Sequence, residues 1–318
     1  MNIDKVKQVY LLGVGGIGMS GLARYFHQLG CAVFGYDKTE TELTETLVRE
    51  GISVIYEDNI SLIPEAFLKP SNEALVIFTP AVPKDLKIKN ELLVRGFELF
   101  KRSQVLGVIS ASRFTVGVAG AHGKTTTSTM IAHILKDTGY DCSAFLGGIS
   151  SNYNTNVLFG DNNVVVVEAD EYDRSFLTLH PNIAVVTSAD ADHLDIYGDA
   201  SSLIDSFKMY LDRVVDGGTR IVKSGLPFAG DISYTREGEA DAHGANVQVI
   251  DGEFHFDYIK EDIVIPNIRL GIPGLHNVEN AVAAITVALL LGIDQDKIVT
   301  ALGNFKGAKR RFEYVVRT

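Results

Sequence analysis

In the stretch Phe114-Thr115-Val116-Gly117-Val118-Ala119-Gly120-Ala121-His122-Gly123-Lys124-Thr125-Thr126-Thr127, a strand rich in β-branched residues passes through a turn of small residues into a helix. Gly120 and Gly123 allow backbone N–H groups to curl around an anion. The N-terminus of the helix adds unsatisfied donors and the positive end of its dipole. The order of strand, glycine turn and helix therefore predicts an α/β domain with a phosphate-binding loop.

Lys124 and Thr125 indicate which phosphate ligand this loop binds. The Lys124 ammonium group can reach the β- and γ-phosphates of a nucleoside triphosphate, and the Thr125 hydroxyl is placed to bind Mg²⁺. The general motif has a glycine where this chain has Val118, so the match is to the shorter form Gly-x-x-Gly-Lys-Thr. The alternative is a glycine-rich turn with a surface lysine. The predicted ATP-binding residues of the loop are Gly120, Ala121, His122, Gly123, Lys124, Thr125 and Thr126.

A second glycine-rich turn follows a short buried strand near the N-terminus. Gly13, Gly15 and Gly18 have the spacing of a dinucleotide-binding loop, and a helix follows them. The next strand ends at Asp37, where such folds place a ribose-binding carboxylate. A further buried strand ends just before Thr79, at the edge where open α/β sheets bind ligands. The residues predicted to contact a phosphate-bearing ligand here are Gly15, Gly16, Ile17, Gly18, Asp37 and Thr79.

Acidic residues follow another buried strand, the valine run 164–167. The stretch Glu168-Ala169-Asp170-Glu171-Tyr172-Asp173 holds four carboxylates in six residues, which repel one another unless a cation lies among them. His193 follows the next such strand, and a neutral imidazole at the same sheet edge is a plausible metal ligand. The alternative is a solvated acidic surface. The predicted metal ligands are Thr125, Glu168 and His193, and the predicted catalytic residues are Lys124, Glu168 and His193.

Three further segments carry predictions. Residues 143–156 are rich in Gly, Ser and Asn, which predicts a loop able to cover a ligand. Asn277 and Asn280 lie three apart on one face of a predicted helix and are suited to hold an adenine ring, whereas Asn277 alone also fits an N-cap. The basic cluster that ends in Arg311 suits an anionic ligand or a solvated surface.

Length and composition indicate an ordinary globular protein. The 318 residues, 46% hydrophobic and 22% charged, predict two domains, with a boundary near Gly107. The formal net charge of −11 argues against a nucleic-acid partner. No apolar run is long enough for a membrane helix, and the N-terminus does not have a signal-peptide pattern. Cys31 and Cys142 lack metal-binding spacing, which predicts a reducing cytoplasm.

Several stretches together resemble the Mur ligases of peptidoglycan synthesis, and most closely their alanine-adding branch. They fall in the order of that family across almost the whole chain. The matching stretches are Gly13-Val14-Gly15-Gly16-Ile17-Gly18-Met19-Ser20-Gly21, Gly120-Ala121-His122-Gly123-Lys124-Thr125-Thr126-Thr127, Glu168-Ala169-Asp170-Glu171-Tyr172-Asp173, Asp192-His193-Leu194-Asp195, Gly274-Leu275-His276-Asn277-Val278-Glu279-Asn280 and Lys309-Arg310-Arg311-Phe312-Glu313.

This resemblance implies an α/β fold with two domains. The N-terminal domain, 1–107, would be a Rossmann-like parallel sheet that binds the UDP part of the substrate and not NAD. The central domain, 108–312, would be a P-loop ATPase-like α/β domain that binds ATP and Mg²⁺. The family's activity implies UDP-N-acetylmuramate and L-alanine as partners, joined through an acyl phosphate made with ATP.

The resemblance also implies roles for single residues. Lys124 corresponds to the phosphate-binding lysine, Glu168 and His193 to metal ligands, and Asn277 with Asn280 to adenine contacts. In the same comparison, Arg311 joins the predicted contacts to the UDP substrate.

Two departures from the family pattern lead to expectations. Several members carry a carbamoylated lysine near the second metal, and this chain has no obvious counterpart, as expected for the alanine-adding branch. Members also have a third domain after the Arg-Arg-Phe stretch, so residues 313–318 are expected to begin a linker to it. The chain is then expected to bind both nucleotides without forming the amide bond.

Three other functions are compatible with parts of the sequence. An NAD-linked oxidoreductase would use residues 13–37 but leaves the phosphate loop and the acidic strand end unexplained. A regulatory module would bind nucleotide without turnover. A salvage ligase would join the same sugar nucleotide to a preformed peptide, although similarity around residues 173–176 favours the alanine-adding branch.

Overall fold

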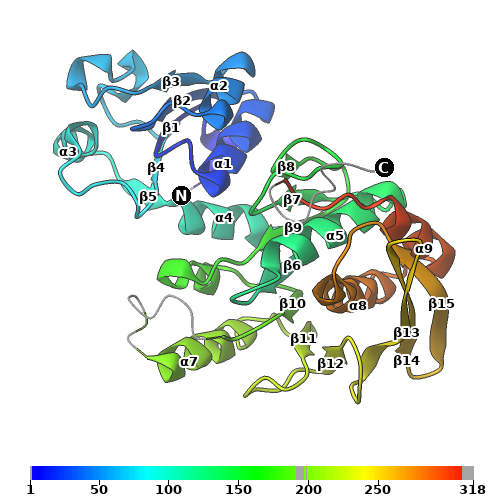
Figure 1. Ribbon diagram of the computed structural model, residues 1–318. Helices are drawn as coiled ribbons and strands as arrows, with labels where there is room; N and C mark the ends of the chain where they lie inside the picture. The colour runs from blue at the N-terminus through cyan, green and yellow to red at the C-terminus, as the bar shows by residue number, and fades with distance from the viewer. Residues whose placement is uncertain (1, 191–196, 198, 310–318) are drawn as a thin grey trace. The chain divides into compact units, whose positions relative to one another are not determined.

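A computed structural model describes residues 2–190, 197 and 199–309 of the protein (Figure 1). The chain divides into two compact units, Met1–Ser112 and Arg113–Thr318. The predicted boundary near Gly107 lies within helix α4 (Arg102–Ala111), and the predicted linker 313–318 lies outside the described residues.

The first unit is built on a five-stranded parallel sheet with the order β3-β2-β1-β4-β5, which confirms the predicted N-terminal fold. Its strands are β1 (Gln8–Leu12), β2 (Ala32–Tyr36), β3 (Ser53–Ile55), β4 (Ala74–Phe78) and β5 (Leu99–Lys101). Its helices, besides α4, are α1 (Ile17–Gln28), α2 (Glu42–Arg49), α3 (Lys87–Val94) and the short η1 (Ile3–Lys5), η2 (Ile60–Leu62) and η3 (Glu65–Phe67).

The strand order of this unit reverses between β1 and β4. From β1 the chain proceeds outward to β2 and β3, and from β4 it proceeds to β5 on the other side. Open α/β sheets bind ligands beyond the carboxyl ends of the strands at such a switch point. Gly13, which opens the predicted glycine loop, follows β1, and the predicted ligand contact Thr79 follows β4, so both lie at this position. Aromatic packing supports the sheet, with the Tyr10 and Phe67 ring centroids 5.3 Å apart.

The second unit is built on a ten-stranded mixed sheet with the order β15-β14-β13-β12-β11-β10-β6-β9-β7-β8. Its central strands are parallel, and β13, β14 and β15 form an antiparallel edge. The strands are β6 (Phe114–Ala119), β7 (Ser143–Phe145), β8 (Val157–Leu158), β9 (Val164–Glu168), β10 (Ile183–Val186), β11 (Thr219–Lys223), β12 (Ile232–Thr235), β13 (Ala242–Ile250), β14 (Glu253–Lys260) and β15 (Ile263–Leu270).

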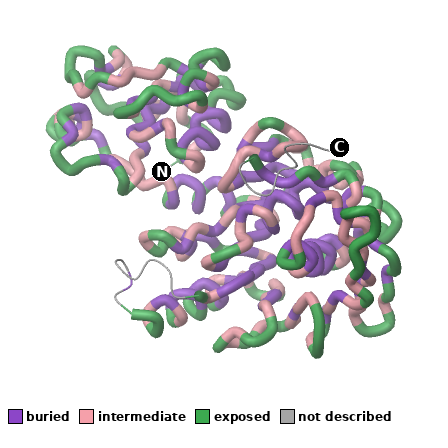
Figure 2. Tube along the Cα trace, in the orientation of Figure 1, coloured by how far each residue is buried: buried purple, intermediate pink, exposed green. Residues whose placement is uncertain are grey.

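Helices cover both faces of this second sheet. The helices are α5 (Lys124–Asp137), α7 (Ala200–Leu211), α8 (Leu275–Leu290), α9 (Gln295–Asn304) and η4 (Tyr172–Thr178). On β6, Val116 and Val118 join the core under α5 and α8, while Gly117 between them faces Tyr210 of α7. Side chains alternate across a strand, so α5 and α8 cover one face and α7 covers the other (Figure 1). The central strands and α8 are almost entirely buried (Figure 2).

One sequence prediction is wrong in this unit, and one alternative interpretation is excluded. Residues 143–156 are not all loop, because Ser143–Phe145 forms strand β7 beside β9, and all three residues are buried. Asn277 is not an N-cap, because α8 begins two residues earlier with Gly274 as its N-cap. Ser143 and Ala144 are small residues that suit a buried strand as well as a loop, which made the pattern of this segment ambiguous.

Cys31 and Cys142 are both buried and not joined in a disulfide. No helix in the part of the chain that the structure describes is long and apolar enough to cross a membrane.

Candidate active site

The predicted phosphate loop lies between the end of β6 and the start of α5. Gly120 has φ 137° and Gly123 has φ 85°, which are conformations that other residues rarely adopt. Gly123 is the N-cap of α5 and has no side chain to cap the helix. The first N–H groups of the helix therefore face the space above the sheet edge, where an anion binds best.

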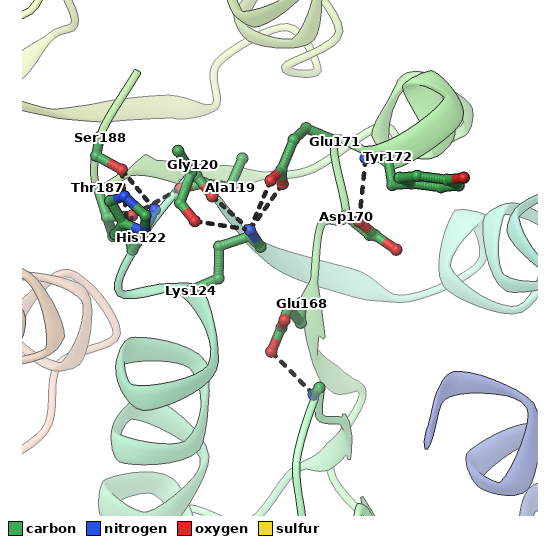
Figure 3. A network of polar contacts seen from close by, with 12 residues as sticks. Ala119, Gly120, His122, Lys124, Glu168, Asp170, Glu171, Tyr172, Thr187 and Ser188 are labelled. Carbon is green, nitrogen blue, oxygen red and sulfur yellow. Dashed lines mark hydrogen bonds and ion pairs between the residues drawn. The ribbon is translucent and has the colours of Figure 1, made fainter. Parts of the chain in front are cut away.

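Residues at the end of β10 hold the loop in this shape. The His122 N–H donates to the Ser188 hydroxyl at 2.7 Å, and the Ala121 N–H donates to the Ser188 carbonyl at 3.3 Å. The Thr187 hydroxyl donates to the His122 carbonyl (Figure 3). Sequence reasoning missed these two polar residues, since contacts between β6 and β10 require the sheet order. The protein's own hydrogen bonds thus fix the shape of the loop.

Lys124 folds back over the loop. Its Nζ lies 2.6 Å from the Gly120 carbonyl oxygen and 3.3 Å from the Ala121 carbonyl oxygen. It also lies 2.8 Å from each carboxylate oxygen of Glu171. In Figure 3 the two side chains point at each other across the loop. The predicted phosphate-binding cation is therefore at the loop, and a buried acid holds it there.

Glu168, at the end of β9, lies beside the first turn of α5. Its Oε1 accepts a hydrogen bond from the Thr125 hydroxyl at 3.1 Å, and its Oε2 accepts one from the Gly147 N–H at 2.9 Å. Burial raises the pKa of the Glu168 carboxyl, while the Thr125 hydroxyl and the Lys124 charge oppose that rise. A carboxylate and a hydroxyl at this distance are oxygen donors of the kind that Mg²⁺ prefers.

The acidic stretch is not a uniform solvated surface. Glu171 is 1% exposed and paired with Lys124, whereas the Asp170 carboxylate accepts the Tyr172 N–H at 3.0 Å. Burial raises the pKa of Glu171, and the Lys124 charge opposes the rise. His193 lies outside the described residues, and the described ones contain no group of three or more His, Cys, Asp or Glu placed to hold a metal. The metal site thus stays a prediction.

Asn280 and Asn277 lie on the first turns of α8. A side chain at Gly123 would approach the Asn280 Oδ1 to 2.9 Å, so Asn280 lies against the phosphate loop. The Asn280 side-chain N–H donates to the Asn277 Oδ1 at 3.2 Å, and the Asn277 side-chain N–H donates to the Pro273 carbonyl. Asn277 is 1% exposed, so it holds the Asn280 side chain through this hydrogen bond from within the protein. The half-buried Thr126 completes the predicted set on the first turn of α5.

The first unit brings its predicted ligand contacts together at the switch point of its sheet. The Asp37 Oδ2 accepts the Gly15 N–H at 2.7 Å, and its Oδ1 accepts the Thr39 N–H at 3.2 Å. Asp37 thus closes the glycine loop. The Thr79 side chain packs against Gly13. Gly16 is the N-cap of α1, and Ile17 is its first residue.

A residue that sequence reasoning left without a role also lies at this loop. The Arg102 side chain, at the start of α4, packs so closely on Gly18 that a Cβ there would come within 2.9 Å of it. Its position directly after the β5 strand was the available signal, because the carboxyl ends of parallel strands share one edge. Arg311 lies outside the described residues.

Two family models match the chain. The model described as Mur ligase family, catalytic domain, matches residues 8–114, and the model described as Mur ligase middle domain matches residues 118–288. Together they cover both glycine loops and the acidic strand end.

Individual proteins are similar over nearly the whole chain. The UDP-N-acetylmuramate–L-alanine ligase of Cytophaga hutchinsonii is 48% identical over 327 residues, which cover 100% of this chain and 70% of that protein. The crystal structure of the UDP-N-acetylmuramate–alanine ligase of Thermotoga maritima is 27% identical with a TM-score of 0.86, covering 98% of this chain and 71% of that one. A UDP-N-acetylmuramate:L-alanyl-γ-D-glutamyl-meso-diaminopimelate ligase from Neisseria meningitides has a TM-score of 0.84 at 23% identity, covering 96% of this chain and 100% of that one, and shares the fold.

Proposed function

The chain belongs to the Mur ligase family, and we propose that it serves the ATP-dependent joining of L-alanine to the carboxylate of UDP-N-acetylmuramate. One observation carries the proposal: a preorganised phosphate loop, with Lys124 and Glu168 beside it, lies in a chain that is similar over its whole length to alanine ligases. The product is a precursor of peptidoglycan, and the expected compartment is the cytoplasm.

The two units divide the binding of substrates in this proposal. The first unit binds UDP-N-acetylmuramate at the switch point of its sheet, where the diphosphate meets the N-terminus of α1 at Ile17 and Gly18. The Arg102 guanidinium group, close to Gly18, supplies a positive charge there. The second unit binds ATP at the loop that opens α5.

The reaction begins when a carboxylate oxygen of the muramyl group attacks the γ-phosphorus of ATP. A P–O bond forms, the bond to the β-phosphate oxygen breaks, and ADP leaves with the electron pair. Lys124 neutralises charge on the β- and γ-phosphates, and the loop N–H groups orient them. The alanine amine then attacks the acyl phosphate carbonyl, loses a proton and displaces inorganic phosphate to give the amide.

The residues present fit a magnesium ion near Thr125 and Glu168. The two oxygen donors lie 3.1 Å apart beside the phosphate loop, and His193 is the proposed ligand of a second ion. When bound, Mg²⁺ supplies positive charge that offsets the charge of the transferring phosphoryl group. The Gly147 N–H holds the Glu168 carboxylate toward Thr125, so that the donors are oriented in advance.

Trapping the acyl phosphate tests this function without relying on the amine. We expect that MgATP, UDP-N-acetylmuramate and hydroxylamine together give ADP and the muramyl hydroxamate, because hydroxylamine displaces phosphate from an acyl phosphate. Lys124→Ala is expected to weaken MgATP binding by about a hundredfold and to abolish the hydroxamate, since it removes the charge that meets the phosphates. Lys208→Ala, an exposed lysine on α7, is the matched control. Hydroxamate formed at the parent rate by Lys124→Ala would contradict the assignment.

The amine and the sugar nucleotide are tested separately. Any amide that forms with L-alanine and a preformed tripeptide in competition is expected to be the alanine adduct by mass spectrometry, and a tripeptide adduct would indicate a salvage ligase. Calorimetry is expected to detect binding of UDP-N-acetylmuramate and not of NAD, because the second unit already has an ATP site and the glycine loop then serves the other substrate. Binding of NAD alone would favour an oxidoreductase.

A further inference from the structure

The hydrogen-bonding capacity of Lys124 is fully used within the protein. Its ammonium group has three N–H bonds. Its acceptors are the Gly120 and Ala121 carbonyl oxygens and the Glu171 carboxylate, with Nζ 2.8 Å from each oxygen of Glu171. A phosphate oxygen can therefore bind Lys124 only by taking over one of these contacts. Figure 3 shows the contacts of Nζ with Gly120 and Glu171.

Glu171 is set deeply in the second unit. Its side chain is 1% exposed, and its backbone carbonyl accepts a hydrogen bond from the Tyr197 hydroxyl. The Phe176 N–H donates to the neighbouring Asp170 carbonyl at 2.8 Å, which ties the segment to η4. A carboxylate held in this way lies 2.8 Å from the Lys124 Nζ. Glu171 is not a proposed metal ligand. That role is proposed for Glu168.

We propose that Glu171 is a positioning residue that holds Lys124 against the phosphate loop and yields it to the β-phosphate of an incoming nucleotide. The proposal rests on the ATP site proposed above and adds to it a competitor built into the fold. In the nucleotide-free protein the acid keeps the ammonium group charged, oriented and in the place where the phosphates arrive.

The carboxylate is the partner that yields, because the two carbonyls cannot move away. Gly120 and Ala121 belong to the loop, which Thr187 and Ser188 fix through hydrogen bonds at its back. A bound phosphate, by contrast, brings negative charge close to Glu171, and like charges at this distance repel. The exchange replaces one anion with another on the same cation. Part of the affinity for the phosphates is therefore spent on releasing Glu171.

Removal of the acid is the decisive change. Glu171→Gln keeps the size and a carbonyl acceptor but removes the charge that competes with phosphate. We expect the Kd for MgATP and for ADP to fall by about tenfold, since a charge-assisted hydrogen bond no longer has to be broken. We also expect a lower melting temperature without nucleotide and a larger rise on addition of ADP. A residue with only a structural role would give weaker nucleotide binding instead.

Two further variants keep the test informative. Glu171→Asp retains the charge but shortens the side chain by one methylene, which weakens the contact with Lys124. It should therefore also tighten ADP binding, although by less than Glu171→Gln does. Glu171→Asp replaces Glu171→Gln in the test if the latter does not fold. Asp173→Asn removes one negative charge from the same segment, and Asp173 is not among the contacts of Lys124 in the described residues. Asn tolerates the φ of 52° at that position, and the Kd for ADP should stay within about twofold of the parent.

The outcomes separate the two proposals. If the parent chain binds MgATP and the Glu171 variants bind it equally or more weakly, the positioning role is wrong and the ATP site stands. If Asp173→Asn tightens binding as much as Glu171→Gln does, the effect is general electrostatics and the positioning role is again wrong. If the parent chain binds no nucleotide, the proposed function itself fails.

Discussion

Tyr210 of α7 places a phenol hydroxyl where the described residues offer it no hydrogen-bond partner. The ring stacks on Phe176 at 5.1 Å, and its hydroxyl occupies the space that a side chain at Gly117 would fill. Burial raises the pKa of Tyr210 well above its usual range. The residue therefore contributes packing through its ring, while desolvation of the hydroxyl opposes folding.

We predict that Tyr210→Phe raises the free energy of unfolding by about 1 kcal/mol, because it removes an uncompensated polar group and keeps the ring. Urea denaturation at neutral pH measures the change. The matched control is Tyr258→Phe, since the Tyr258 hydroxyl is also buried but lies 3.0 Å from the Thr286 hydroxyl. That variant should lose stability. A loss in Tyr210→Phe of similar size would contradict the prediction.

Gly147 lies so close to Glu168 that it leaves no room for a side chain. A methyl group there would lie 2.1 Å from both carboxylate oxygens of Glu168, so Gly147→Ala must displace the proposed metal ligand. We predict that the Mg²⁺-dependent part of ATP binding weakens by about tenfold or more, as found when the support of a metal ligand is removed. Isothermal titration with Mg²⁺ and again with EDTA measures it. An equal loss in both conditions would point to general disruption of the loop.

At the scale of elements, α5 couples the phosphate loop to the body of the second unit. Its first turn carries the loop, and its middle carries the buried His133. The His133 Nε2 lies 2.9 Å from the Ala301 carbonyl of α9, and the Nδ1 lies 3.0 Å from the Tyr153 hydroxyl. The carbonyl accepts only, so Nε2 donates and the imidazole is neutral when Nδ1 accepts the Tyr153 proton.

This arrangement predicts a dependence of stability on pH. Burial lowers the pKa of His133 below its ordinary value near 6.5, although the bond to Ala301 and the nearby Asp137 charge act in the opposite direction. Below about pH 6.5 the unfolded chain takes up a proton that the folded protein resists, so stability is lost as pH falls from there toward the lowered pKa. Unfolding free energies from pH 7.5 to 5 measure the slope, and His133→Gln, which keeps an N–H donor, should flatten it. An unchanged slope would exclude His133 as the source.

At the scale of the whole molecule, each unit has its own sheet and its own core. Tyr10, Val76 and Phe67 belong to the core of the first unit, whereas Val118, Val166 and Ile285 belong to that of the second. The division after Ser112 follows the end of α4 and precedes β6. Independent cores allow independent folding, because each buries apolar surface without the other.

We therefore predict that residues 1–112 and 113–318, produced separately, both fold and each keep one ligand. The first piece should bind UDP-N-acetylmuramate, and the second should bind MgATP with nearly the Kd of the uncut chain. Circular dichroism melting and calorimetry check both. A first piece that melts without a cooperative transition would show that the two cores depend on each other.

The sequence by itself determined the alternation of strands and helices, both glycine loops, and Lys124, Thr125 and Glu168 as neighbours. Such features follow from local rules: buried parallel strands are continuous apolar runs, and a glycine turn before a helix binds phosphate. The order of strands in the first sheet could also be predicted from the sequence, because alternating strands and helices typically form a parallel sheet with a switch point.

Only the tertiary structure decided which polar groups meet across distant segments. Glu171 lies 47 positions from Lys124, and the Thr187–Ser188 pair lies more than 60 positions from the loop it fixes. Gly147 meets Glu168 because β7, which the sequence read as loop, lies beside β9. Contacts of this kind depend on the order of the strands and on the space that neighbouring elements leave for each side chain. Those are properties of packing, which no local pattern of residues encodes.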